Sequence, residues 1–278
     1  MEHLEFEANA FDGLRLYFQG WQAKPGPKGA VCLVHGLGEH SGRYTQWAEW
    51  LNNAGYSVLS FDLRGHGKSG GQRGHVLSYD EYFRDVDLAL QETQERYHQK
   101  TQFIYGHSLG AMIVAEYVLR RKPKLAGAII TALSYKSSLA EQKMKVLLVK
   151  LLGGVIPKMQ IDTGLVPATL SHDHEVVSRY INDPLVHHIS SLGMGKATIA
   201  SITWGTAHAG DWTLPVLVMH GELDQLGFAQ GSRDFANKIT GDCTLKIWPG
   251  LFHEIHNEPE KDQVFAYLRD WLDKHSQS

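Results

Sequence analysis

The chain has 278 residues, of which 43% are hydrophobic and 21% are charged, with a formal net charge of -3. This length and composition fit one large globular domain or two small ones, and the slight negative charge gives no reason to expect nucleic acid as a partner. The first residues lack the basic and apolar regions of a signal peptide, and no apolar run is long enough to span a bilayer. We therefore expect a soluble, cytoplasmic protein.

The predicted elements alternate between strand and helix. Apolar residues at every second position flank Asp12-Gly13 within residues 2–22, which predicts an antiparallel hairpin. Short apolar runs predict buried strands at 30–34, 56–61, 101–105, 125–130, 215–219 and 244–248. Helical patterns occur at 44–53, 78–98, 111–120, 229–239 and 259–275. This order predicts an α/β fold with a mostly parallel sheet and helices on both faces.

The alternation breaks at about residues 134–211, where helix-like pieces such as 141–152 are separated by glycines and prolines. It resumes with the strand at 215–219. We therefore predict a single domain over residues 1–278 with a helical insertion, not two tandem domains. Cys32 and Cys243 each lie in an apolar, strand-like run, which predicts two buried thiols and no disulfide or metal site.

The central motif is Gly106-His107-Ser108-Leu109-Gly110, between a predicted strand and a predicted helix. A serine at such a junction is typical of a nucleophile elbow, in which side chains at the two glycine positions would collide with the neighbouring strand and helix. The N–H of Leu109 would then point to the place where an oxyanion forms. The alternative is a turn of small residues with an incidental serine, because the pentapeptide alone is common.

A serine nucleophile needs a base that is oriented by a carboxylate. The loops after the last two predicted strands supply Asp224 and His253, and the carboxyl ends of parallel strands converge on one crevice. We therefore predict Ser108, Asp224 and His253 as a catalytic triad. Glu222 is the alternative acid and His256 the alternative base.

The glycine-rich loop after the strand at 30–34 is the expected source of a second oxyanion donor. The N–H of Leu37 is the natural partner for that of Leu109. His35, at the start of the loop, is expected to hold it by hydrogen bonds and not to act in catalysis.

The order of serine, aspartate and histidine on this strand pattern resembles the α/β-hydrolase superfamily. The sequence HGLGEHSGRY at 35–44 is similar to the signature of monoacylglycerol lipases and lysophospholipases, and the similarity extends through DLRGHGKS at 62–69, NDPL at 182–185 and the His253 loop. It covers nearly the whole chain and is weakest in the insertion. There, the family's proline-rich turn is replaced by Thr131-Ala132-Leu133-Ser134.

The resemblance implies a serine hydrolase that cleaves the acyl ester of monoacylglycerol to fatty acid and glycerol, without a cofactor or a metal. The alternatives are a lysophospholipase or broad carboxylesterase, an acyltransferase, and a non-catalytic ligand-binding member of the fold. The resemblance also implies that Glu39, Arg43 and His256 bind the glycerol head group. A purely structural role, in which Glu39 and Arg43 pair and hold the loop, stays open.

By resemblance, the insertion at 134–211 is a cap over the site. Residues 144–156 are more apolar than an ordinary surface helix. We expect them both to line an acyl tunnel and to contact lipid, which makes transient membrane contact a further expectation. The alternative is a plain core helix. The histidines at 172, 174, 187 and 188 are expected to be polar residues and not metal ligands.

Overall fold

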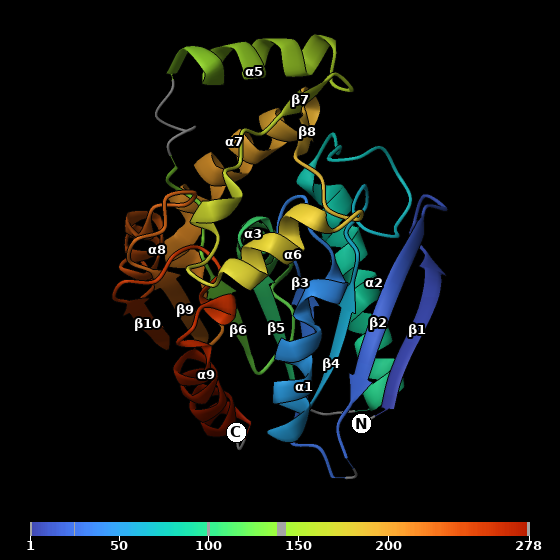
Figure 1. Cartoon of the computed structure of the whole chain (residues 1–278), viewed down its shortest axis with the longest axis vertical. Coiled ribbons are helices and arrows are strands. Elements are labelled where there is room, and N and C mark those ends of the chain that lie inside the picture. Colours follow the sequence, from blue (N-terminus) through green and yellow to red (C-terminus); the bar gives the residue numbers. More distant parts are fainter. Residues whose placement is uncertain (1, 25, 99–100, 138–142, 277–278) are drawn as a thin grey trace.

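The computed structural model describes residues 2–24, 26–98, 101–137 and 143–276. Its centre is an eight-stranded sheet in the order β1-β2-β4-β3-β5-β6-β9-β10 (Figure 1). The strands are β1 (Glu2–Asn9), β2 (Arg15–Gln22), β3 (Gly29–Val34), β4 (Tyr56–Phe61), β5 (Gln102–His107), β6 (Gly127–Thr131), β9 (Val216–Gly221) and β10 (Cys243–Trp248). From β4 to β10 all neighbouring strands are parallel, while β2 is antiparallel to both β1 and β4. The predicted fold class is confirmed.

The predicted hairpin forms the antiparallel edge of the sheet. Its turn requires a left-handed residue, which is Gly13 with φ of 80°. Phe6 of β1 faces Phe18 of β2, and their rings stack with centroids 4.9 Å apart. Apolar side chains on one side of the ribbon therefore fix its register against the core.

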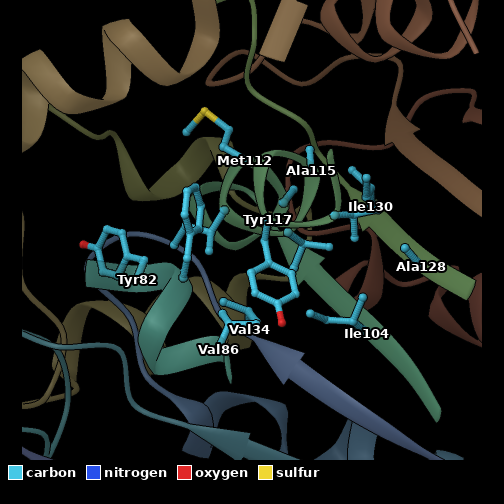
Figure 2. Packing of buried hydrophobic residues seen from close by; sticks show 14 of the residues in the cluster. Val34, Tyr82, Val86, Ile104, Met112, Ala115, Tyr117, Ala128 and Ile130 are labelled. Carbon is cyan, nitrogen blue, oxygen red and sulfur yellow. The ribbon is translucent and has the colours of Figure 1, made fainter. Parts of the chain in front are cut away.

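Helices cover both faces of the sheet, as predicted. One face carries α1 (Thr45–Asn53) and α9 (Lys261–His275), and the other carries α2 (Tyr79–Tyr97), α3 (Leu109–Arg121) and α8 (Ala229–Ala236). Successive residues of β3 alternate between the two hydrophobic clusters, because side chains on a strand point to opposite faces. Figure 2 shows part of the second face, where Ile104 and Ile130 of the sheet, Val86 of α2 and Tyr117 of α3 belong to one buried cluster.

The prediction that both cysteines are buried is wrong for Cys243, because that residue lies at an edge of the sheet. Cys32 lies in the inner strand β3 and is buried, but Cys243 is only half-buried. Cys243 begins β10, which pairs with β9 alone and leaves its other edge without a strand. Both thiols are free.

The segment between β6 and β9 contains most of the elements that the sequence did not resolve. It holds α5 (Lys143–Val155), β7 (Gln160–Asp162), η2 (Pro167–Thr169), α6 (His174–Asn182), β8 (Ile189–Ser191), α7 (Leu192–His208) and η3 (Ala209–Asp211). The short strands β7 and β8 pair as a separate antiparallel sheet. Figure 1 shows these elements above the carboxyl ends of the central strands, with α5 outermost. The predicted helix at 141–152 corresponds to α5, although residues 141 and 142 lie outside the described residues.

The apolar helix α5 packs on α7, which in turn packs on α2 and α3. Its close contacts are made by small residues: a Cβ on Gly153 would lie 2.5 Å from the carbonyl oxygen of Leu192. Much of the rest is exposed, including Met144 (71%), Leu151 (61%) and Val155 (78%). The described residues therefore leave much of the apolar surface of α5 uncovered. None of the described helices has both the length and the apolar character needed to cross a bilayer.

Candidate active site

Ser108 lies on a strained turn between β5 and α3. Its φ of 54° and ψ of -112° are unfavourable for a residue with a side chain, and the surrounding contacts hold it there. A Cβ on Gly110 would collide with the carbonyl oxygens of Val34 and His35, and a Cβ on Gly106 would collide with the carbonyl oxygen of Gly110. Both glycines are therefore required by close backbone packing, as the motif predicts.

Loops that follow β9 and β10 bring an acid and a base to the serine. His253 Nε2 lies 2.9 Å from Ser108 Oγ, and His253 Nδ1 lies 2.7 Å from Asp224 Oδ2. Asp224 and His253 are both buried, while Glu222, the alternative acid, is exposed. His256, the alternative base, makes no hydrogen bond to Ser108 or Asp224 among the described residues, and its ring centroid lies 4.9 Å from that of His107, as does the ring centroid of His253. The structure therefore joins the three residues predicted as a triad.

Four donors hold the carboxylate of Asp224. Its Oδ1 accepts the N–H groups of Leu226 and Gly227, and its Oδ2 accepts from His253 and from His220 Nε2, which is 2.9 Å away. Burial alone would raise the pKa of Asp224, but the two histidines outweigh burial and hold the pKa well below its usual range. The carboxylate is therefore charged and fixed in orientation.

His253 has an electrostatic environment suited to a general base. Burial disfavours its charged form, but the charge and hydrogen bond of Asp224 outweigh burial and raise the pKa of His253 above its ordinary value of 6.5. Glu254 and Glu39 act in the same direction. A base that accepts a proton from serine gains from this stabilisation of its imidazolium form.

The glycine-rich loop after β3 lies directly against the elbow. A Cβ on Gly36 would be 3.3 Å from Ser108 Cβ. His35 holds the loop: its Nδ1–H donates to the Gly36 carbonyl oxygen at 2.8 Å, and its Nε2 accepts the Leu63 N–H at 2.9 Å. Leu109 is the first residue of α3, where backbone N–H groups have no partner within the helix. The loop containing Leu37 and the start of α3 thus border the serine from two sides.

The three residues implied for glycerol binding have different surroundings. Glu39 and Arg43 form an ion pair, with Arg43 Nη1 2.5 Å from Glu39 Oε2. His256 stacks on Tyr44 with ring centroids 5.0 Å apart, and its buried Nδ1 has no hydrogen-bond partner among the described residues. Burial lowers the pKa of His256 to about 4, so its ring is neutral near pH 7.

Sequence reasoning missed two residues that support this site. His220 bonds to Asp224, and its place at the end of β9 next to the acid loop is a usable signal. Glu254 follows His253 and forms a two-pronged salt bridge with Arg43. Its signal in the sequence is weak, because the partners lie 211 residues apart.

Two histidines of the insertion, His172 and His187, contact residues outside it. His172 Nδ1 lies 3.1 Å from Glu258 Oε1, and His187 Nε2 lies 3.1 Å from the Gly65 carbonyl oxygen. The N–H of His187 donates to the carbonyl oxygen of Gly38 in the loop beside the serine. These bonds connect the segment between β6 and β9 to the loops around the site.

The sheet, the elbow and the order of the three bonded residues define the α/β-hydrolase class. Within this class, a family model described as serine aminopeptidase, S33, matches residues 25–260, and the chain belongs to that family. The chain is a hydrolase of the lipase type, as the resemblance at 35–44 implies.

Individual relatives agree with this assignment. A monoacylglycerol lipase of Mycolicibacterium smegmatis is 32% identical over 95% of this chain and 94% of its own length. The crystal structure of a monoacylglycerol lipase of Paleococcus ferrophilus superposes with a TM-score of 0.86 at 35% identity, covering 94% of this chain and 99% of the other. An abhydrolase domain-containing protein of Dictyostelium discoideum is 35% identical over 92% of this chain, which spans 27% of that longer protein.

Proposed function

We propose that the chain hydrolyses the acyl ester of monoacylglycerol to a fatty acid and glycerol through an acyl-serine intermediate. The observation that carries the proposal is the chain of hydrogen bonds from Ser108 Oγ through His253 to Asp224. In the first step His253 Nε2 takes the proton of Ser108 as its Oγ attacks the ester carbonyl. Asp224 holds the imidazole in the tautomer with hydrogen on Nδ1.

The N–H groups of Leu37 and Leu109 stabilise the oxyanion that forms in this attack. Such a donor typically contributes about 3 kcal/mol to transition-state stabilisation. As the tetrahedral intermediate collapses, the ester C–O bond breaks and His253 gives its proton to the leaving glycerol oxygen. Water then attacks the acyl-serine with His253 again as the base, which releases the fatty acid and restores Ser108.

Monoacylglycerol is the proposed substrate for two reasons. Two of the relatives above carry the name monoacylglycerol lipase, and the residues at 35–44 resemble the signature of that family.

The diol of a bound glycerol head group needs polar partners when it is buried. Of the three residues implied for it, His256 offers an unpartnered polar atom within the described residues, whereas Glu39 and Arg43 already bond to each other. We assign the direct contact with glycerol to His256, while Glu39 and Arg43 shape the loop.

The segment at about 134–211 is proposed to be a cap of the single domain, and α5 its contact with lipid. Support comes from the exposed apolar side chains of α5, which form a larger apolar surface than a solvent-facing helix normally carries. An interfacial helix of this kind would bring the enzyme to membranes or micelles as a peripheral protein.

The test is a comparison of one acyl chain on monoacylglycerol, lysophosphatidylcholine and diacylglycerol. We expect the fastest turnover on monoacylglycerol, and none by Ser108→Ala. Substantial activity in Ser108→Ala would overturn the mechanism. Faster turnover of lysophosphatidylcholine would make the enzyme a lysophospholipase, equal rates would make it a broad carboxylesterase, and acyl transfer to an added alcohol in preference to water would make it an acyltransferase.

The head-group assignment has its own variant. His256→Phe keeps an aromatic ring against Tyr44 and removes both ring nitrogens. We expect it to raise KM for monoacylglycerol and to leave KM for a methyl ester of the same acid unchanged. Equal effects on both esters would remove His256 from glycerol recognition.

A further inference from the structure

Arg43 is held between two buried carboxylates that belong to different parts of the site. Its Nη1 donates to Glu39 Oε2 at 2.5 Å and to Glu254 Oε1 at 2.7 Å, and its Nη2 donates to Glu254 Oε2 at 2.8 Å. The exposed fractions of the three side chains are 10%, 3% and 2%. Arg43 also lies over the ring of Tyr180 in α6, 4.7 Å from its centroid. Water therefore screens these contacts little.

The first carboxylate holds the loop that borders the serine. Glu39 Oε1 accepts the N–H of Gly36 at 2.6 Å and the hydroxyl of Tyr44 at 2.8 Å. Gly36 directly precedes Leu37, the proposed oxyanion donor, and lies against Ser108. A movement of Glu39 would therefore move the loop that supplies this donor.

The second carboxylate belongs to the loop of the base. Glu254 is the residue after His253, and its N–H donates to the Leu170 carbonyl oxygen at 2.8 Å. Glu254 Oε2 also accepts Asn257 Nδ2 at 2.7 Å. A continuous series of short bonds thus runs from Gly36 through Glu39, Arg43 and Glu254 to the backbone of His253.

We propose that Glu254 is a positioning residue for hydrolysis, which acts through Arg43 to hold His253 in register with the oxyanion loop. This inference rests on the proposed acyl-serine mechanism. The base and the oxyanion donors must be placed to within a fraction of an ångström relative to the same carbonyl group, yet they lie on loops far apart in the chain. One guanidinium fixes their relative position because it binds both carboxylates with directional bonds.

The charges of this cluster suit the same role. Two carboxylates share one guanidinium, which leaves one negative charge beside the base. Burial alone would raise the pKa of Glu254, but Arg43 outweighs it and lowers the pKa to about 2, so Glu254 is ionised near pH 7. Glu254 and Glu39 both favour the imidazolium form of His253. A buried carboxylate that stabilised the fold far from His253 would have no such effect on the titration of the base.

The experiment compares Glu254→Gln with a matched control, Glu116→Gln. Glu116 is also a buried carboxylate paired with an arginine, Arg120, at 2.7 Å, but it lies in α3 outside the proposed machinery. The readout is the rate at which Ser108 is phosphonylated by a fluorophosphonate across pH, alongside kcat and KM on monoacylglycerol. Phosphonylation needs the serine, the base and the oxyanion donors but no glycerol head group. If monoacylglycerol is not the substrate, the phosphonylation rate still tests the role of Glu254.

For Glu254→Gln we expect the phosphonylation rate and kcat to fall at least about tenfold with KM nearly constant. The acidic midpoint of the pH profile should move down by at least about half a unit, because a charge near the base is lost. Glu116→Gln should do neither. An unchanged rate or midpoint in Glu254→Gln, or the same shift in Glu116→Gln, would overturn the proposal.

Thermal unfolding would reveal whether Glu254→Gln folds, and a second variant tests the proposal if it does not. Glu254→Asp keeps the charge and shortens the side chain, so the midpoint should stay while the rate falls. A shifted midpoint with an unchanged rate in Glu254→Asp would also overturn the proposal.

Discussion

Replacement of Asp224 by asparagine should remove catalysis and leave the fold intact. The amide can adopt only one orientation, because the N–H groups of Leu226 and Gly227 require an acceptor at the Oδ1 position. The NH2 group then takes the place of Oδ2, opposite His253 Nδ1. Two donors cannot face each other, so the imidazole must lose its Nδ1 hydrogen and carry it on Nε2. In that tautomer it cannot accept the proton of Ser108.

The expected loss in kcat is about four orders of magnitude, or about 5 kcal/mol in activation free energy. The loss of stability should be smaller, about 1–3 kcal/mol. His220 Nε2 still donates to the Gly227 carbonyl oxygen at 2.8 Å, and the new tautomer of His253 accepts from the amide. The NH2 group also faces His220 Nε2, which lies 2.9 Å from the Oδ2 position, so one unfavourable donor–donor contact remains and accounts for this cost.

The assay is steady-state hydrolysis of monoacylglycerol at pH 8, with thermal unfolding of each variant in the same buffer. Glu222→Gln is the control, because it makes the same chemical change two residues away at an exposed position. It should retain full activity. A loss below about tenfold in Asp224→Asn, with the fold preserved, would refute the account of how Asp224 acts.

Three further predictions concern pH, packing and lipid. Because the pKa of His253 is raised above 6.5, the rise of kcat/KM with pH should have its midpoint above pH 6.5, and a midpoint below 6.5 would contradict the assigned electrostatics. The same proton stabilises the folded state below pH 6.5, and this stabilisation is lost as pH rises through the raised pKa. Gly110→Ala should lower the free energy of unfolding by about 1–3 kcal/mol, because its Cβ would collide with backbone carbonyl oxygens whose positions are fixed by the fold. The measurement is denaturant titration, and an unchanged denaturant concentration at half unfolding would contradict the packing. Leu148→Glu with Leu152→Glu should weaken liposome binding and turnover of micellar substrate but not of a water-soluble short ester, and unchanged binding would remove α5 from lipid contact.

The central sheet could be predicted from sequence because each inner strand is an apolar run buried on both faces. The catalytic order followed from the same pattern, since Asp224 and His253 lie directly after strands whose carboxyl ends meet near Ser108.

The insertion could not be predicted to the same degree. β7 and β8 have three residues each and exist only because they pair, and α7 has apolar residues on most of its faces because it packs between α5 and the sheet helices. The link from Glu254 to Arg43 was missed for a related reason. A carboxylate after His253 becomes informative only when the fold brings Arg43 within 2.7 Å.

The most direct test of the central claim is rapid acid quenching of the enzyme during monoacylglycerol turnover, followed by peptide mass spectrometry. We predict a peptide containing Ser108 that is heavier by one acyl group, present in the wild type and absent from Ser108→Ala. Turnover without any acylated peptide, or acylation at another residue, would contradict the assignment of Ser108 as the nucleophile.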